Sequence, residues 1–588
     1  MAYDAKTLVR ELEAASGKIP VDLIFENLRL VDVYTGEVRK TNLAMFGGKI
    51  VGVGVAKDTE CAERVDCGGR YAVPGFLDAH VHIETTLLTP EALGQVIVPW
   101  GTTTLFVDAM EIANVAGNEG LLALVKDAHN LPFRIFLEIP SRVPTAPGLE
   151  TAGAELGVTE VEQLLTLPES VSLGELDPSK ILDIREEYLQ KVCVALNLGK
   201  ICNGHAIGLS ADALNIYATG HLHDDHESVT YEELLERLRV GLKALVREGS
   251  SERNVLALIK GVVENGLPTE NILFCTDDKH VQDIHKEGHI SYNIQQAINC
   301  GLDPVKAIQI ATVNAAKHFR LDHMIGSLTP GRQADIVLLD DLKTIRPAAV
   351  YKDGKCVAEN GSALPTEQKS YPDKLFNTVH LPAGLSKESF AIYTQGKEAK
   401  CRVISLIQDQ IINEEKQLWM PIANGEISAS VPRDILKLSV VERHGKNGHI
   451  STALVMGFGL QKGALASSVS HDHHNIVVMG GNDADMLLAV QELGRIHGGF
   501  AAACDGRILG SVALPLAGLM SLENADEVMR RMDVLNEEVE KLGCPMASPF
   551  MSLSFISLPT VPQLGLTDYG LIDVLGHKIT NLVLETKA

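Results

Sequence analysis

Aromatic residues and paired cysteines are both scarce in this chain. Phe, Trp and Tyr together make up 5% of the 588 residues, and Trp occurs only twice. The ten cysteines form no CxxC pair and no dense framework, which favours reduced thiols over a disulfide scaffold. No uncharged apolar stretch approaches the roughly 18 to 20 residues that span a bilayer. The sequence therefore argues against a disulfide-rich secreted domain and against a transmembrane protein.

Basic residues are also in deficit. The chain has 52 Lys and Arg against 76 Asp and Glu, a formal net charge of −24. This acidic surplus argues against nucleic acid or an anionic membrane as the main partner. Residues 1–18 mix both charges with short apolar steps, which predicts an amphipathic helix and not a signal peptide. We therefore expect a cytoplasmic protein.

Two stretches with strand-like alternation lie far apart in the sequence. Residues 22–54 alternate apolar and polar side chains, and a similar texture returns at 326–361. We expect both to build one small β-sandwich, with 1–72 and 323–370 as its two parts. The pattern then changes to a mixture of strands and helices, which predicts a separate α+β domain over 371–588.

The intervening residues, 73–322, repeat one unit, in which an apolar run ends in polar residues. From His82 onward these transitions recur at intervals of 26, 30, 37, 30, 21, 21 and 30 residues. Each interval suits one strand and one helix, so eight units predict a (β/α)₈ barrel inserted into the sandwich. The site is expected where the strands end, at the C-terminal face. The sixth and seventh units are short, so their strands are the least clearly marked.

Potential metal ligands collect at these strand ends. The pair His80 and His82 follows the first strand, where alternate residues point to the same side. A carboxylate from a middle strand can bridge two cations, and two close cations lower the pKa of a shared water. The candidate ligands are His80, His82, Glu175, His205, His226 and Asp277. His221 or His223 could replace His226, and Asp277 is also the candidate proton carrier.

The motifs that carry these residues resemble the amidohydrolase superfamily, and within it the bacterial adenine deaminases. The runs PGFLDAHVHIE and GSLTPGRQADIVLLD match the superfamily, and HIETTLLTP, REGSSERN, CTDD and SHDHHNIVVMG are similar to the adenine deaminase motifs HIESSMMTP, REGSAARN, CTDD and SHDSHNIVVIG. The resemblance covers nearly the whole chain from about residue 20. It implies a binuclear hydrolase that converts adenine and water to hypoxanthine and ammonia, commonly with Mn²⁺ or Fe²⁺ and with Zn²⁺ as an alternative. It also implies the same six ligands and a homodimer or larger homo-oligomer.

Substrate contacts are expected in the loops after the strands. Glu111 and Glu84 are candidates for hydrogen bonds to ring nitrogens during catalysis. The residues expected to bind the substrate are Met110, Arg142, Asp278 and Glu287.

Three positions depart from the family's motifs. Met110 stands where the family has His, Arg142 stands in SRVPT where the family has SCVPA, and Lys286 stands where an acidic or neutral residue is expected. A guanidinium would suit an anionic group better than a neutral purine. One alternative is therefore an amidohydrolase for an anionic purine or a cyclic amide, read by Arg142. A second alternative is that Arg142 points away from the site and pairs with an acidic neighbour. A non-catalytic assembly module is the remote alternative, because such relatives usually lose ligands.

The segment Ser470–Asn475 in the C-terminal region is rich in histidine. His471 and His473 repeat the spacing of His80 and His82, but the family has Ser in place of His473. Three interpretations remain open: contact with the mouth of the active site, a metal site, or structural hydrogen bonding. Cys275, just before Asp277, is expected to pack in the barrel wall.

Overall fold

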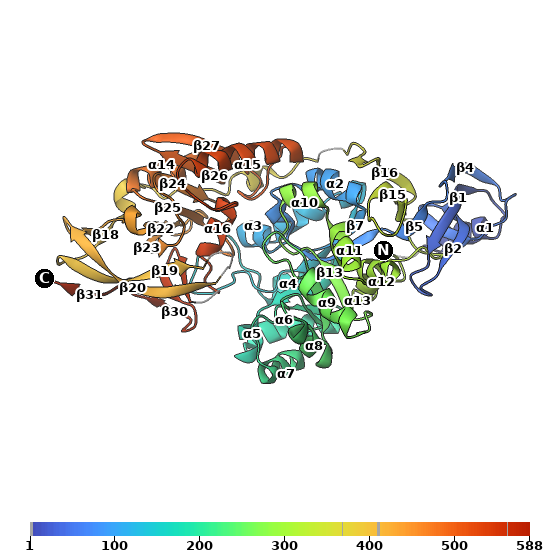
Figure 1. The fold of residues 1–588 in the computed structure, drawn as a ribbon, viewed down its shortest axis with the longest axis horizontal. Coiled ribbons are helices and arrows are strands. Elements are labelled where there is room, and N and C mark those ends of the chain that lie inside the picture. The colour runs from blue at the N-terminus through green and yellow to red at the C-terminus, as the bar shows by residue number, and fades with distance from the viewer. Residues whose placement is uncertain (1–3, 367–368, 408–411, 561–562) are drawn as a thin grey trace.

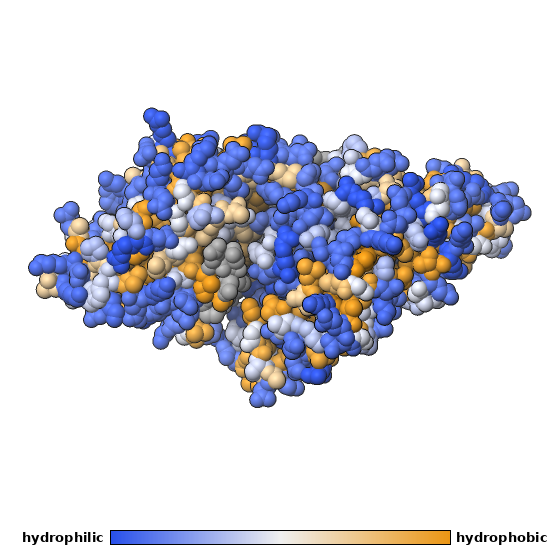
Figure 2. Space-filling view, in the orientation of Figure 1, coloured by the Kyte–Doolittle hydropathy of each residue, from blue (hydrophilic) through white to orange (hydrophobic). Residues whose placement is uncertain are grey.

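The computed structural model describes residues 4–366, 369–407, 412–560 and 563–588. The molecule is elongated, with the N-terminal strands at one end, the barrel in the middle and the C-terminal sheet at the other end (Figure 1). Charged and polar residues cover most of the face seen in Figure 2, as the composition leads one to expect.

The chain begins with the predicted amphipathic helix, α1 (Ala5–Ala15). The Asp4 side chain caps it by accepting hydrogen bonds from the backbone N–H groups of Lys6 and Thr7. Strands β1 (Val21–Val31), β2 (Val38–Phe46) and β3 (Lys49–Val53) follow as an antiparallel meander.

One sheet joins segments from both sides of the barrel. Among the described residues it has the strand order β17-β16-β15-β14-β5-β1-β2-β3, with β4 beside β1. Its later members are β4 (Cys61–Asp66), β5 (Tyr71–Pro74), β14 (Ile336–Leu339), β15 (Pro347–Lys352), β16 (Lys355–Glu359) and β17 (Ser362–Ala363). The antiparallel pairing of β5 with β14 brings the chain entering the barrel beside the chain leaving it.

The barrel strands fall where the strand ends were predicted. In chain order they are β6 (Phe76–Val81), β7 (Thr102–Asp108), β8 (Arg134–Ile139), β9 (Ser170–Leu176), β10 (Ile201–Gly204), β11 (Asp224–Asp225), β12 (Lys243–Arg247) and β13 (Ile272–Cys275). Neighbouring strands pair in parallel from β6 to β10 and from β11 to β13, and the ring closes where the Asp277 N–H donates to the His80 carbonyl at 3.0 Å. The sixth strand, β11, has only two residues, and the His223 N–H donates across to the Cys202 carbonyl at 2.9 Å.

Helices cover the outside of the barrel. The longer ones are α2 (Pro90–Ile97), α3 (Met110–Val125), α4 (Val158–Leu165), α6 (Glu186–Asn197), α7 (Ala211–Thr219), α8 (Tyr231–Arg239), α9 (Val255–Glu264) and α11 (Ile290–Asn299). Shorter helices are α5 (Pro178–Leu182), α10 (Val281–Glu287), α12 (Pro304–Gln309) and α13 (Ala315–His318). Cys275 lies in the apolar cluster beneath them, as expected for a packing residue.

The C-terminal region is a mixed α/β unit built on one large sheet. In the described part of the chain its order is β18-β21-β20-β19-β23-β22-β25-β24-β26-β27, with β31 beside β19. The strands are β18 (Ile392–Tyr393), β19 (Glu398–Leu406), β20 (Asn413–Ala423), β21 (Glu426–Ile427), β22 (Ile435–Val441), β23 (Ile450–Met456), β24 (Ala464–Ser467), β25 (Ile476–Gly480), β26 (Gly499–Cys504), β27 (Arg507–Ala513) and β31 (Val583–Lys587). Helices α14 (Asp483–Arg495), α15 (Ala525–Glu540) and α16 (Pro549–Ile556) accompany it, with a small sheet of β28 (Leu564–Thr567), β29 (Gly570–Asp573) and β30 (Lys578–Thr580).

Buried hydrogen bonds attach this region to the open end of the barrel. The Thr151 hydroxyl donates to Asp568 at 2.6 Å, and the Asn475 side-chain amide donates to the Thr151 carbonyl at 2.9 Å. A backbone hydrogen bond from Ser521 to Leu87 adds a third tie at 2.8 Å. The ends of the barrel strands therefore face the C-terminal sheet. Within the described ranges, no helix combines the length and apolar character needed to cross a membrane.

Candidate active site

A cavity of about 960 Å³ lies at the C-terminal ends of the barrel strands. Five of the six predicted ligands line it: His82, Glu175, His205, His226 and Asp277. The sixth, His80, is 1% exposed, and its Nε2 lies 3.7 Å from Asp277 Oδ1. Residues separated by almost 200 positions in the sequence thus meet because parallel strands end at one face.

The imidazole rings of His80 and His82 are each oriented by a neighbouring hydrogen-bond acceptor. His80 Nδ1 lies 2.6 Å from a carboxylate oxygen of Glu138, and His82 Nδ1 donates to the Asp108 carbonyl at 2.8 Å. With Nδ1 engaged, each ring has Nε2 available to bind a cation. The Nε2 atoms lie 3.7 and 3.4 Å from the same oxygen, Asp277 Oδ1, in the order His80 and His82.

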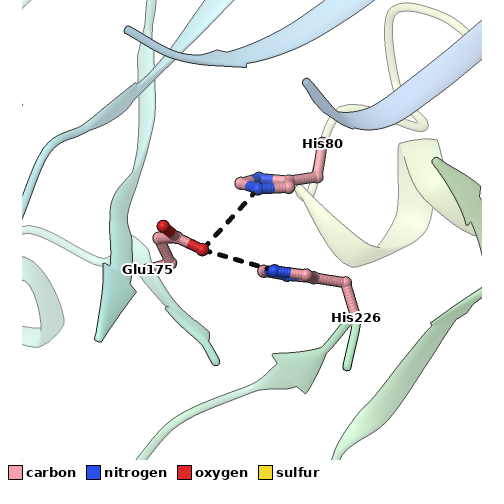
Figure 3. A group of neighbouring side chains, drawn as sticks. All are labelled: His80, Glu175 and His226. Atoms are coloured by element: carbon pink, nitrogen blue, oxygen red, sulfur yellow. Dashed lines mark ion pairs between the residues drawn. The ribbon is translucent and has the colours of Figure 1, made fainter. Parts of the chain in front are cut away.

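Glu175 occupies the centre of the ligand set. Its Oε2 lies 3.9 Å from His80 Nε2, 3.3 Å from His226 Nε2 and 3.1 Å from His205 Nδ1. Figure 3 shows the His80 and His226 rings converging on this oxygen from two strands. Gly174 permits the position, because a Cβ there would lie 2.3 Å from Asp108 Oδ2, which accepts the Glu175 N–H.

Two further residues complete the far side of the site, and the sequence did not single out either of them as a site residue. Glu227 lies 3.3 Å from His205 Nδ1 and 3.2 Å from His226 Nε2. Arg247 donates to Glu227 at 2.9 Å and to Asp277 Oδ2 at 2.6 Å. The available signal was the placement of both residues at predicted strand ends, directly after His226 and at the end of the seventh strand.

These side chains fit two divalent cations. His80, His82 and Asp277 place one ligand atom each within 4.8 Å of one another, and so do His80, Glu175 and His226. A third group of the same kind is His205, His226 and Glu227. The buried Nε2 of His80 has no hydrogen-bond partner, as expected of a nitrogen that binds a cation. Imidazole and carboxylate donors of this kind suit Mn²⁺, Fe²⁺ and Zn²⁺.

Buried arginines keep the two key carboxylates ionised. Burial alone would raise their pKa values, but the Arg247 guanidinium outweighs burial and lowers the pKa of Asp277 to about 2. The Arg142 guanidinium in the same way holds the pKa of Glu175 well below its usual range. By contrast, burial and the neighbouring Asp277 raise the pKa of Asp278 to about 8. The cavity therefore contains carboxyl groups whose pKa values are shifted in opposite directions.

Two of the three positions that depart from the family's motifs, Met110 and Arg142, line the cavity. Arg142 does not point away from the site, but its charge is matched by acidic neighbours. One amino group contacts Glu175 and the other lies 3.3 Å from Asp472 Oδ2 of the C-terminal region. The guanidinium is 5% exposed and its Nε has no partner.

Other predicted residues lie outside the lining of this cavity. Glu287 pairs instead with Arg253 at 2.9 Å and with Lys279 at 3.0 Å, on helix α10. Lys286, the third position that departs from the family's motifs, is exposed on the same helix and does not line the cavity. Glu84 is buried behind the wall, where it accepts the Ile112 N–H at 3.1 Å.

The alternatives to His226 are separated from the cavity. His223 precedes β11, at the opposite end of the strand, and its Nδ1 accepts the Cys202 N–H at 3.1 Å. His221 is exposed in the preceding turn. His226 follows the strand and is 2% exposed among the other candidate ligands.

The histidine-rich segment of the C-terminal region reaches the cavity. His471 and Asp472 line it, together with Phe555. His473 does not, and its Nδ1 accepts the Asn475 N–H at 3.1 Å. Of the three interpretations of this segment, contact with the cavity describes the positions of His471 and Asp472, and hydrogen bonding describes the position of His473.

Comparisons with known proteins identify the family of the chain. The family described as "Amidohydrolase family" matches residues 71–358, and "Adenine deaminase C-terminal domain" matches residues 410–578. A protein named adenine deaminase from Desulforamulus reducens is 58% identical over 588 residues, 100% of both chains. Another of that name from Dehalococcoides mccartyi is 39% identical over 97% of this chain and 98% of its own. Among solved structures, a β-aspartyl dipeptidase from Fervidobacterium islandicum is 20% identical, with a TM-score of 0.46, over 60% of this chain and 99% of its own. The chain belongs to the adenine deaminase family of amidohydrolases.

Proposed function

We propose that the protein hydrolyses adenine to hypoxanthine and ammonia. The observation that carries the proposal is that the ligand atoms of five side chains form groups within 4.8 Å at the floor of one cavity. These residues are His80, His82, Glu175, His226 and Asp277. The 58% identity to a relative named adenine deaminase supports the choice of substrate. His205 completes the proposed ligand set beside Glu175.

Two divalent cations, when bound, supply the positive charge that makes a water molecule nucleophilic near neutral pH. The ligands proposed to hold them are His80, His82, Glu175, His205, His226 and Asp277. We propose Mn²⁺ or Fe²⁺ as the native ions, with Zn²⁺ as the alternative. Metal analysis of protein grown in each ion, with turnover measured for each, tests this choice.

Asp277 is the proposed proton carrier. Arg247 keeps its carboxylate ionised, so Asp277 can take one proton from the attacking water. The oxygen of that water bonds to the ring carbon that bears the amine, and the C–N bond then breaks. Asp277 returns the proton to the leaving nitrogen, which departs as ammonia.

Glu111 is the proposed contact to a ring nitrogen, because it lines the cavity and Glu84 does not. Burial raises the pKa of Glu111 well above its usual range, so a protonated carboxyl is available to donate a hydrogen bond. Glu84 acts through position alone, by holding the first turn of α3 at Ile112. Asp278, which also carries a raised pKa, is the second proposed donor to the purine.

An anionic substrate is the second candidate and is less well supported. Arg142 has the required charge, but Glu175 and Asp472 already neutralise it. The test compares release of ammonia from adenine with release from anionic purines and carboxylated cyclic amides, using metal-loaded wild type and Arg142→Ala. Preference for adenine in both proteins supports the first candidate. A preference for an anion that Arg142→Ala abolishes supports the second.

We further propose a cytoplasmic homodimer or larger homo-oligomer, in which the barrel spans 73–322 and is inserted into a β-sandwich formed by 1–72 and 323–370. The α+β domain would span 371–588. Light scattering measures the oligomer, and limited proteolysis with mass spectrometry locates the boundaries.

A further inference from the structure

The C-terminal sheet contributes a histidine, His471, to the wall of the cavity. It follows β24 in a loop that crosses from the sheet to the barrel, and it is 3% exposed. The ring stacks on Phe555, with centroids 4.6 Å apart and an 8° angle between planes. This stacking holds the orientation of the imidazole without using either nitrogen.

One nitrogen of His471 faces the barrel. Its Nδ1 lies 3.6 Å from Glu111 Oε1, while the other oxygen of Glu111 lies 3.7 Å from His82 Nδ1. A single carboxyl group therefore lies between a predicted metal ligand and His471. A substrate that hydrogen-bonds Glu111 would therefore lie beside His471.

The other nitrogen of His471 is buried and has no hydrogen-bond partner. A buried polar atom without a partner destabilises the fold, and such an atom persists where a ligand supplies the missing hydrogen bond. The ring lines the main cavity, but this nitrogen itself has almost no accessible surface, so a bound molecule would reach it once the ring adjusts.

We propose that His471 Nε2 hydrogen-bonds the rim of the purine, so that the C-terminal domain takes part in substrate recognition. The proposal rests on adenine deamination as the function. The purine rim alternates nitrogens that accept with N–H groups that donate, and a neutral imidazole nitrogen can match either kind. His471 is neutral near pH 7, because burial lowers its pKa to about 4.

A cation held by Glu111, His471 and His474 is the competing interpretation, since their ligand atoms lie within 4.8 Å of one another. The surroundings of His474 disfavour it. The Ser470 N–H approaches His474 Nδ1 at 3.5 Å as a donor, which places the ring proton on Nε2. A protonated Nε2 cannot bind a cation.

The test compares four variants of the full-length, metal-loaded protein. His471→Ala removes the contact. His471→Gln extends an amide to the position of Nε2, whereas His471→Asn reaches only the position of Nδ1. His473→Ser is the matched control, because its side chain lies in the same segment outside the cavity lining. The readouts are kcat and KM for adenine, bound metal per chain, the thermal transition, and the Kd of the product hypoxanthine by calorimetry.

We expect His471→Ala to lower kcat/KM about 100-fold and to weaken hypoxanthine binding, with metal content unchanged. His471→Gln should retain at least about ten times the kcat/KM of His471→Asn, and His473→Ser should stay within about threefold of wild type. Unchanged kinetics in His471→Ala would overturn the proposal. So would equal losses in the Gln and Asn variants, or the loss of one bound metal ion. If the metal-loaded wild type releases no ammonia from adenine, the proposed function itself fails. If the wild type turns over adenine and the His471 variants have the same kinetics as the wild type, only this inference is overturned.

Discussion

The hydrogen bond between Glu138 and His80 should control how tightly the site holds a cation. Glu138 Oε2 lies 2.6 Å from His80 Nδ1, and both side chains are at most 1% exposed. His80 presents Nε2 as a ligand only when the shared proton lies on Nδ1 and the carboxylate accepts it. A Glu138→Gln variant keeps the shape, but its amide can face Nδ1 with either its oxygen or its NH₂ group. The NH₂ orientation places the proton on Nε2 and blocks ligation.

The expected size of this effect follows from the loss of an orienting partner. Such losses typically weaken metal binding about 10- to 100-fold, which corresponds to ~1.4–2.7 kcal/mol. Glu138→Gln should fall at the lower end, because the oxygen orientation still accepts from Nδ1. Glu138→Leu should fall at the upper end, because it leaves a buried N–H without a partner.

The assay is competition for Mn²⁺ between the protein and a calibrated chelator, with bound metal counted by elemental analysis. Glu248→Gln is the matched control, because Glu248 is also a buried barrel carboxylate, 3% exposed, but accepts the backbone N–H of Val255 instead of contacting a histidine ligand. If Glu138→Gln binds Mn²⁺ as tightly as wild type, or if Glu248→Gln loses as much affinity, the proposed role of Glu138 is refuted.

Three further outcomes are expected. Asp277→Asn should lower turnover by several powers of ten with the fold intact by circular dichroism, because it removes both a ligand charge and the proton carrier; retained activity would contradict the site. Arg142→Cys should raise Mn²⁺ affinity at least about tenfold, because the guanidinium competes with the cation for Glu175. The double variant that also carries Met110→His should raise kcat/KM for adenine. If neither Mn²⁺ affinity nor kcat/KM increases, the two substitutions are neutral. Burial opposes ionisation of Asp224, but the 2.6 Å contact with His318 outweighs burial and lowers the pKa of this carboxyl group. Its ionised form therefore stabilises the fold fully above the unfolded pKa of about 3.9, and this contribution declines as pH falls from there through the lower pKa of the folded state. His318→Gln should therefore lower the thermal transition at pH 6 more than at pH 3.5, and an equal decrease at both would argue against the pair.

The barrel and most of its site could be predicted because their signals are local. Each strand is an apolar run that ends in polar residues, and parallel strands necessarily bring such ends together. The two-residue strand β11 is the exception in length, and it matches the shortest spacing in the repeat. His226 was the least secure ligand for the same reason, since three histidines surround so short a strand.

Contacts between distant segments left no comparable signal. Asp472 meets Arg142 across 330 positions, and no local pattern indicates that the C-terminal sheet lies over the barrel mouth. The positions of Glu287 and Lys286 outside the cavity lining have a related cause. Glu287 and Lys286 lie close in sequence to the Asp277 motif at the site. Helix α10, however, directs Glu287 toward Arg253 and leaves Lys286 in solvent.

The hydrogen bond between Thr151 and Asp568 joins the barrel to the C-terminal region, so the cavity between them depends on both parts of the chain. Every predicted metal ligand lies before residue 300, whereas part of the cavity wall follows residue 470. A cut in the linker between the barrel and the C-terminal sheet would leave the chelating residues together and remove His471, Asp472 and Phe555 from above them. The residues proposed to hold metal ions all precede such a cut, whereas the proposed substrate contacts lie on both sides of it, with Glu111 and Asp278 before it and His471 after it.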